Sequence, residues 1–308
     1  MYPRRLHRSQ FTRRTHLKWG PPIHRCALLF ALLLAPLAAH ADEPAVNITP
    51  DVVYGHKDGL AMTFDVFTPT ENARGIGVLF MVSGGWYSGW QPPEKSRPFF
   101  TPLTGAGYTA FAVRHGSSPR YGIPDAVSDV RRSVRYIRLH ADEFGIDPDR
   151  IGVYGMSAGG HLSLMLGTAS DEGQSDAEDP VLRVSDRVQA VVAYVAPTDL
   201  TIVVHDAPEH LPAHENFPAL DLDMENAKIY SPLSHVTDDD PPTLLLAGVK
   251  DELVPIDHSR RIRDAFDLKR VTAKLIEFEN GGHGFPPEDT RTALAEMVAW
   301  FDAHLLEE

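Results

Sequence analysis

Six short apolar runs recur along this 308-residue chain, separated by stretches with other patterns. Each run has six to eight residues, which is short for a buried helix and suits a strand buried on both faces of a parallel sheet. The runs cover residues 77–82, 108–113, 150–155, 188–195, 242–248 and 273–278. Because parallel neighbours cannot be joined by a tight hairpin, the stretches between the runs must supply crossovers, usually helices.

Helical periodicity is clearest between the second and third runs. Apolar residues there recur three and four positions apart, as on one face of a helix: Val127, Val130, Val134, Ile137, Ala141 and Phe144. Residues 290–306 form a second amphipathic pattern at the end of the chain. Strands that alternate with helices predict an α/β fold, with a doubly wound, mostly parallel, twisted sheet and helices on both faces.

A small antiparallel pair is expected before the parallel strands. Residues 60–67 alternate between apolar and polar, and the turn dipeptide Asp58-Gly59 precedes them. No internal repeat or long linker interrupts the chain after this point. We therefore expect one catalytic domain over residues 42–308.

The first 41 residues have the composition of an export signal. Residues 1–25 contain seven arginines and lysines and no acidic residue, and an apolar run and the ending Ala39-His40-Ala41 follow. A basic region, a short apolar region and small residues at the end indicate a cleaved signal peptide. The alternative is a membrane anchor, but the apolar run, residues 27–39, falls short of the roughly 20 residues that a bilayer-spanning helix needs.

We expect cleavage after Ala41, which makes Asp42 the first residue of a periplasmic or secreted chain with no stable membrane association. Residues 12–18, TRRTHLK, resemble a twin-arginine export motif. A long polar gap separates them from the apolar run, so the export route and the true start codon stay open.

The charge of the expected mature chain argues against nucleic acid as a partner. The whole chain carries a formal net charge of −13, and removing the seven positive charges of residues 1–41 leaves −20. So acidic a surface repels phosphate backbones and anionic membranes. The single cysteine, Cys26, belongs to the leader, so neither a disulfide nor a catalytic thiol is expected in the mature chain.

The segment GMSAG, residues 155–159, follows the third apolar run and precedes a helix-like stretch. A serine at so tight a strand-to-helix turn is forced into a strained conformation that exposes its hydroxyl, and its neighbours must be small. The motif alone is also compatible with a glycine-rich structural turn. Its context favours Ser157 as a nucleophile.

A serine nucleophile needs a base and a third group that orients the base. Asp251 follows the run at 242–248, and His283 follows the run at 273–278, so both should emerge at the same sheet edge as Ser157. The order Ser157, Asp251, His283 is that of α/β-hydrolases. Glu252 and Asp257 are the alternatives for the acid.

The motifs GMSAGGHL, KDELVP and GGHGF resemble those of α/β-hydrolase esterases, particularly the acetylxylan and feruloyl esterase group, over roughly residues 77–305. The resemblance implies an oxyanion hole formed by the backbone N–H of Ala158 and by donors in the loop after residue 82. We assign Gly85 and Trp86 as those donors by position. Related esterases usually have a histidine before these glycines, where this chain has Ser83.

Two further features bear on the substrate. Tyr87 and Trp90 are candidates for an acyl or sugar subsite, or they pack the loop down. Residues 198–230 are expected to form a small lid insert that shapes specificity. This insert contains four residues that could bind a metal, but prolines interrupt any helix that would align them, so no metal site or cofactor is expected: His205, Asp206, His210 and His214.

These observations together predict an exported serine hydrolase that cleaves carboxylic esters through an acyl-enzyme. The resemblance implies short acyl or feruloyl esters of plant polysaccharides as substrates. A general short-chain carboxylesterase and a peptidase or amidase of the same fold are the enzymatic alternatives. A catalytically silent binding protein is the alternative outside the enzymes.

Overall fold

The computed structural model describes residues 45–208 and 210–306. The expected signal peptide, residues 1–41, and its cleavage site lie outside the described residues. Among the helices that the structure describes, none combines the length and the apolar character that crossing a bilayer requires.

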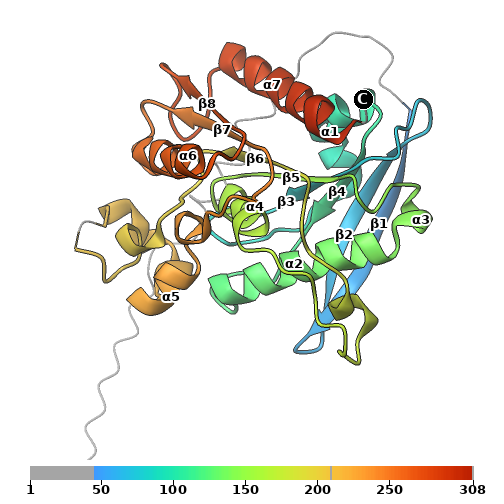
Figure 1. Cartoon of the computed structure of the whole chain (residues 1–308), viewed down its shortest axis with the longest axis horizontal. Helices are drawn as coiled ribbons and strands as arrows, with labels where there is room; N and C mark the ends of the chain where they lie inside the picture. Colours follow the sequence, from blue (N-terminus) through green and yellow to red (C-terminus); the bar gives the residue numbers. More distant parts are fainter. Residues whose placement is uncertain (1–44, 209, 307–308) are drawn as a thin grey trace, which may run out of the picture. The chain divides into compact units, whose positions relative to one another are not determined.

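The centre of the fold is an eight-stranded sheet with the order β1-β2-β4-β3-β5-β6-β7-β8 (Figure 1). From β4 to β8 every neighbouring pair is parallel. The strands are β1 (Val46–Lys57), β2 (Leu60–Pro69), β3 (Gly77–Met81), β4 (Thr109–Val113), β5 (Ile151–Met156), β6 (Ala190–Tyr194), β7 (Thr243–Gly248) and β8 (Ala273–Phe278). The six predicted parallel strands are thus confirmed, with ends shifted by at most two residues.

The antiparallel start of the sheet follows from the turn at Asp58 and Gly59. β1 pairs with β2 across this turn, with Lys57 opposite Leu60, and β2 then pairs antiparallel with β4. Both turn residues have positive φ, at 49° for Asp58 and 79° for Gly59. That conformation is the one that a two-residue hairpin turn with the right twist requires.

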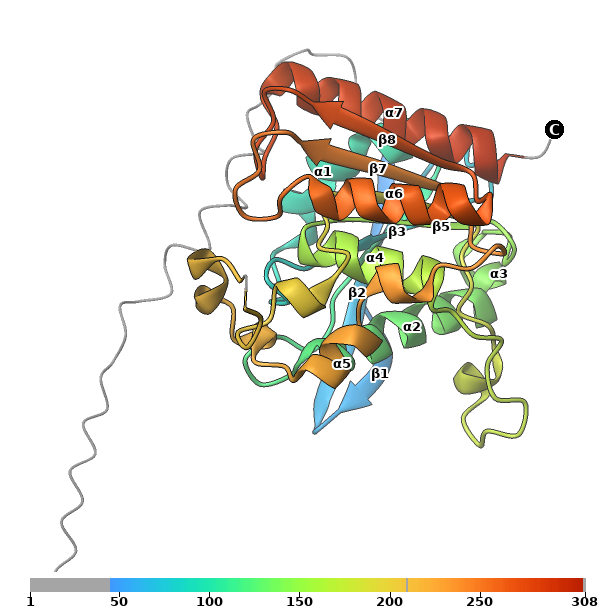
Figure 2. The same ribbon diagram turned by 60° about the vertical axis from the view of Figure 1, so that its left-hand side comes forward.

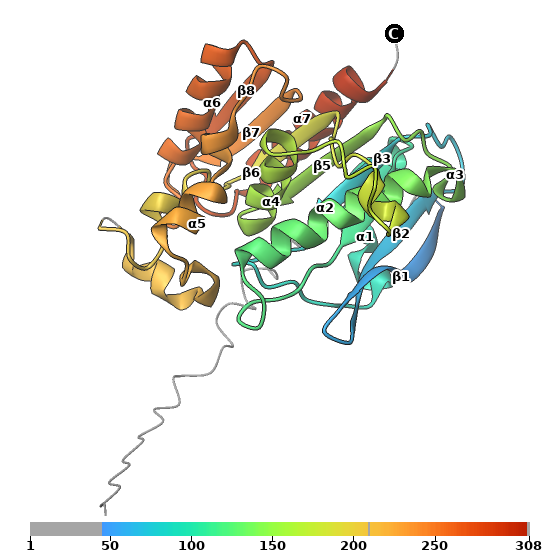
Figure 3. The same ribbon diagram turned by 60° about the horizontal axis from the view of Figure 1, so that its bottom comes forward.

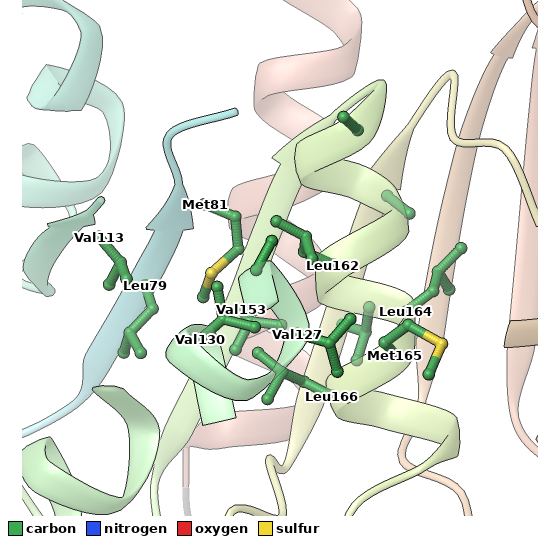
Figure 4. Packing of buried hydrophobic residues seen from close by; sticks show 14 of the residues in the cluster. Leu79, Met81, Val113, Val127, Val130, Val153, Leu162, Leu164, Met165 and Leu166 are labelled. Atoms are coloured by element: carbon green, nitrogen blue, oxygen red, sulfur yellow. The ribbon is translucent and has the colours of Figure 1, made fainter. Parts of the chain in front are cut away.

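Helices cover both faces of the sheet, as predicted. On one face lie α2 (Ile123–Leu139), α3 (Ala141–Phe144), α4 (Ala158–Thr168) and α6 (Asp257–Lys269); on the other lie α1 (Pro93–Gly105) and α7 (Pro287–Leu305) (Figure 3). Figure 4 shows the packing between the sheet and the helices of the first face, where Leu79 and Val153 of the sheet lie near Val130 of α2 and Leu162 of α4. The first four residues of the predicted stripe, Val127 to Ile137, lie on the buried face of α2, and its last two, Ala141 and Phe144, lie in the separate short helix α3.

The predicted insert, residues 198–230, lies between β6 and β7. It consists of short 3-10 turns and the helix α5 (Met224–Ile229), and Figure 2 shows it as the gold-to-orange group of short helical turns around α5. Its first turn is held by Thr198, whose backbone N–H and side-chain hydroxyl both bond to His258 at the start of α6.

Candidate active site

Ser157 occupies the turn between β5 and α4 with φ of 55° and ψ of −121°. Positive φ is uncommon for a residue with a side chain and marks strain. The turn is possible because a Cβ on Gly155 would lie 2.3 Å from the backbone of Gly159, and one on Gly159 would lie 2.5 Å from the carbonyl oxygen of Met81. The glycines around the serine are therefore required by close backbone approach.

The structure brings Ser157, His283 and Asp251 together in one line of hydrogen bonds. His283 Nε2 lies 2.9 Å from Ser157 Oγ, and His283 Nδ1 lies 2.8 Å from Asp251 Oδ2. The Asp251 side chain is fully buried and that of His283 is largely buried. In this geometry the imidazole can accept the serine proton while the carboxylate holds its Nδ1–H.

The loop that carries Asp251 fixes the direction of its carboxylate. Oδ1 accepts the backbone N–H groups of Leu253 and Val254, both at 2.9 Å, which leaves Oδ2 for His283. Glu252 and Asp257, the other acids weighed from the sequence, are exposed, and it is Asp251 that bonds to His283. The aspartate loop and the histidine loop approach so closely that a Cβ on Gly248 would lie 2.4 Å from the carbonyl oxygen of Gly282.

The predicted oxyanion donors surround Ser157. The N–H of Ala158 lies in the first turn of α4, where it has no acceptor within the helix. Gly85 and Trp86 line the same pocket as Ser157 and both have positive φ, at 56° and 58°. Within residues 45–208 and 210–306, the backbone N–H groups of Gly85, Trp86 and Ala158 have no recorded protein acceptor. By contrast, the N–H of Ser157 bonds to the carbonyl oxygen of Tyr194.

A small, mostly apolar pocket, partly open to solvent, has Ser157 in its lining. The insert supplies four of its lining residues, and these were not singled out as pocket residues from the sequence. The lining residues are Gly85, Trp86, Ser157, Pro197, Val203, His214, Phe217, Leu220, Leu253 and Val254. Val203 and Leu220 are buried apolar residues in a segment that carries no periodic pattern, so only their place in the insert could have indicated them.

Tyr87 and Trp90 do not line this pocket. Their side chains are 61% and 59% exposed, and the Trp90 indole N–H donates to Asp51 Oδ1 of β1. The backbone of Tyr87 pairs with that of Gly84 in both directions. Both aromatic side chains therefore face solvent, close in the sequence to Gly85 and Trp86.

The histidines of the insert form hydrogen bonds with backbone carbonyl oxygens. His205, His210 and His214 each place one ring nitrogen on a carbonyl oxygen, that of His214, Ala207 and Leu253 respectively. Among the described residues, which omit residue 209, no three potential ligands are grouped so that they could hold a metal ion.

Burial lowers the pKa of three histidines to about 4: His115, His161 and His258. His115 and His258 are 4% exposed and His161 is 0% exposed. Sequence reasoning did not assign a role to any of them, although His161 belongs to the quoted motif GMSAGGHL. All three rings are therefore neutral at neutral pH.

These pKa values predict a strong acid sensitivity of the fold. An unfolded histidine titrates near pH ~6.5, so between that pH and about 4 the unfolded chain binds protons that the folded chain excludes. The free energy of unfolding should therefore fall as the pH is lowered, by roughly 3 kcal/mol for each fully excluded proton. Urea unfolding at pH 7.5, 6 and 5 measures this, in a range where few carboxylates titrate. Equal free energies at the three pH values would contradict the prediction.

Residues 64–266 match the model of the family BD-FAE. Among curated proteins, the chain is 32% identical over 236 residues to the probable carboxylic ester hydrolase LipM of Mycobacterium tuberculosis, which covers 74% of this chain and 53% of LipM. The chain spans between half and two thirds of the length of the curated relatives it matches.

Solved structures support the same fold. A truncated carbohydrate esterase from gut microbiota superposes with a TM-score of 0.71 at 24% identity, over 85% of this chain and 98% of the other. An acetyl ester-xyloside bifunctional hydrolase from Caldicellulosiruptor lactoaceticus gives a TM-score of 0.70 at 24% identity, over 82% of this chain and 95% of the other. The α/β-hydrolase fold predicted from the order of the triad is thus confirmed.

Proposed function

This chain belongs to the BD-FAE family, and we propose from that premise that it hydrolyses carboxylic esters through an acyl-enzyme on Ser157. The observation that carries the proposal is the line of bonds from Ser157 Oγ through His283 to Asp251, beside a pocket that Ser157 shares with Gly85 and Trp86. The similarity to a probable carboxylic ester hydrolase agrees with it.

The proposed reaction uses only groups of this chain and water. Ser157 Oγ attacks the ester carbonyl carbon while His283 Nε2 takes the hydroxyl proton. The N–H groups of Ala158, Gly85 and Trp86 stabilise the negative oxygen of the tetrahedral intermediate. His283 then gives its proton to the departing alcohol, and a water molecule, activated by the same ring, releases the acid from Ser157.

We propose a short acyl group as the part of the substrate that enters the pocket. Val203, Phe217 and Leu220 make the wall apolar, and Phe217 lies so close to the oxyanion loop that a Cβ on Gly85 would be 2.4 Å from its ring. An apolar wall this close to the reacting carbonyl favours a small acyl chain. A feruloyl group is the alternative acyl part, because it is apolar and aromatic.

We propose a sugar as the alcohol part. The exposed side chains of Tyr87 and Trp90 lie one and four residues after Trp86 in the sequence, and such aromatic rings can stack on the apolar face of a sugar ring. Two structural neighbours are a carbohydrate esterase and an acetyl ester-xyloside hydrolase. Acetylated or feruloylated plant polysaccharides are therefore the substrates to test, and we place the enzyme outside the cytoplasm on the strength of its leader sequence.

The acyl preference can be measured with p-nitrophenyl esters of increasing chain length. We expect kcat/KM to be highest for acetyl to butyryl esters and to fall for octanoyl esters. Phe217→Ala should move the optimum to longer chains, since each added buried methylene is worth about 0.8 kcal/mol, or roughly fourfold. Ile229→Ala is the control, because this exposed residue of the same insert does not line the pocket. An unchanged optimum in Phe217→Ala would refute the assigned acyl pocket.

The same protein should be tested with acetylated xylan, feruloylated arabinoxylan and p-nitroanilide amides. Release of acetate from xylan supports the acetyl ester reading, and release of ferulate supports the feruloyl alternative. Faster cleavage of anilides than of esters would replace the proposal with an amidase. No turnover of any of these compounds would favour the silent binding protein.

A further inference from the structure

The loop that offers two of the oxyanion donors has a backbone shape that needs support. We call residues 83–88 the oxyanion loop. Gly85 and Trp86 both have positive φ, and for Trp86 this is unfavourable because an aromatic residue rarely adopts the left-handed region. Such a conformation persists only where the surroundings determine it. The contacts of this loop therefore decide whether its N–H groups point toward the substrate oxygen.

His115, directly after β4, supports the start of the oxyanion loop. Its Nε2 lies 2.9 Å from Ser83 Oγ, and its Nδ1 lies 2.8 Å from the carbonyl oxygen of Gly116. Because a carbonyl oxygen can only accept, Nδ1 carries the ring proton, and Nε2 accepts the Ser83 hydroxyl. A neutral histidine with this tautomer satisfies both bonds.

His161, four residues after Ser157 on α4, supports the oxyanion loop at Trp86. Its Nδ1 lies 3.2 Å from the indole nitrogen of Trp86, and its Nε2 lies 2.7 Å from the carbonyl oxygen of Tyr230 at the end of the insert. An indole N–H can only donate, so His161 Nδ1 must be unprotonated. A protonated ring would direct a second N–H at the indole and break this contact.

Backbone and serine contacts complete the attachment. The N–H of Ser118 donates to the carbonyl oxygen of Trp86, and the N–H of His115 donates to Ser88 Oγ. The N–H of Ser88 in turn donates to Ser117 Oγ. The oxyanion loop is thus bonded along its length to residues 115–118, and at Trp86 to α4.

We propose that His115 and His161 are positioning residues that hold the oxyanion loop from two sides, His115 through the Ser83 hydroxyl and His161 through the Trp86 indole. They fix Gly85 and Trp86 in the left-handed conformation, so that the donors stand ready before the substrate binds. Related esterases usually have a histidine at the position of Ser83. In this chain the imidazole ring next to that position comes from His115, two residues after β4. The inference rests on the proposed ester hydrolysis at Ser157.

The effect should appear in the transition state and little in substrate binding. Preorganised N–H donors stabilise the oxyanion of the transition state, and this negative oxygen does not yet exist in the bound ester. Complete loss of one donor typically costs about 10²–10³ in kcat, so a displaced loop should cost about 10- to 100-fold. KM should change by less than about threefold.

The experiment compares His115→Leu and His161→Leu with the wild-type chain, measuring kcat, KM and the inhibition constant of a trifluoromethyl ketone. That ketone forms a tetrahedral adduct with the serine and places an oxyanion in the hole. We expect its inhibition constant to rise by the same factor as kcat/KM falls. His115→Gln and His161→Gln, which keep one donor and one acceptor, should recover most of the loss.

His258→Leu is the matched control. His258 is as buried as His115, and its ring accepts the backbone N–H of Thr198 at the start of the insert instead of a group of the oxyanion loop. Its replacement should lower thermal stability to a similar extent and leave kcat and the inhibition constant within about threefold. If His258→Leu lowered kcat as much as the two test variants, the loss would reflect general destabilisation, and the positioning role would be rejected.

Two variants with smaller changes to the side chain test the inference if a leucine variant does not fold. Ser83→Ala removes only the hydroxyl that faces His115, whereas Trp86→Phe removes the indole N–H that faces His161 together with part of the ring. Each should lower kcat about tenfold. Adding His161→Leu to Trp86→Phe should cost little more, because the contact is already lost. Fully additive effects, or unchanged kcat and inhibition constant in all four variants, would overturn the inference. An active Ser157→Ala variant would instead overturn the proposed function itself.

Discussion

Ser157→Ala is expected to lower kcat by roughly 10⁴- to 10⁶-fold, because the variant lacks the oxygen that forms the covalent bond to the acyl group. The fold should be retained. The backbone of Ser157 keeps its bonds from its N–H to Tyr194 and from His161 to its carbonyl oxygen, and neither uses the side chain. Hydrolysis of p-nitrophenyl acetate and the thermal unfolding midpoint measure the two effects separately.

Ser163→Ala is the control for this variant. Ser163 is a fully buried serine on the same helix, and its hydroxyl donates to the carbonyl oxygen of Gly159. Its removal should cost a little stability and leave kcat within a few-fold of the wild-type value. A Ser157→Ala variant that turns over as fast as Ser163→Ala would show that another group is the nucleophile.

Asp251→Asn is expected to lower kcat/KM by roughly 10³- to 10⁴-fold without unfolding the chain. The N–H groups of Leu253 and Val254 both donate to Oδ1, so the asparagine must place its oxygen there and its NH₂ toward His283. His283 Nδ1 must then accept, which puts the ring proton on Nε2, opposite Ser157 Oγ. The ring then has no lone pair available for the serine proton.

Glu252→Gln is the matched control for the acid, since it makes the same change one residue along the chain. Glu252 is exposed, so its replacement should leave kcat/KM within about twofold. If Glu252→Gln abolished activity and Asp251→Asn did not, the acid would have to be reassigned to Glu252.

The parallel strands could be predicted because each is a compact apolar run that is buried on both faces. The helix α1 could not, because Pro98 and Pro102 interrupt its sequence and a proline inside a helix disfavours it. It forms nevertheless because Phe100 and Leu103 are almost fully buried in the cluster between the sheet and α7. The bounds of β1 could not be predicted either, since half of the residues of that edge strand are exposed and its sequence shows no apolar run.

The triad residues were identifiable for a topological reason. Parallel strands end at a common edge, so Ser157, Asp251 and His283, each just after a strand, had to lie near one another. The supports of the oxyanion loop had no such signal. Ser83 and His115 are 32 residues apart, each two residues after the end of a different strand, and the pairing of β3 with β4 brings them together.

For the pocket, the sequence could predict which segment contributes to the lining, but not which of its residues do so. The insert, residues 198–230, was expected to shape the substrate site, and four of its residues line the pocket. Which four could not be read from the sequence, because short 3-10 turns impose no fixed spacing between the side chains on one side. Sequence likewise placed Tyr87 and Trp90 beside the site, whereas the structure shows that their rings face solvent.

The most direct test of the central claim is the mass of the chain after reaction with an organophosphate such as paraoxon, followed by peptide mapping. If Ser157 is the activated nucleophile, one diethyl phosphate group should be added per chain, on the peptide that contains Ser157, with activity lost in proportion. Ser157→Ala should gain no mass under the same conditions. A chain that loses activity with the label on another residue, or that remains fully active with Ser157 labelled, would contradict the account.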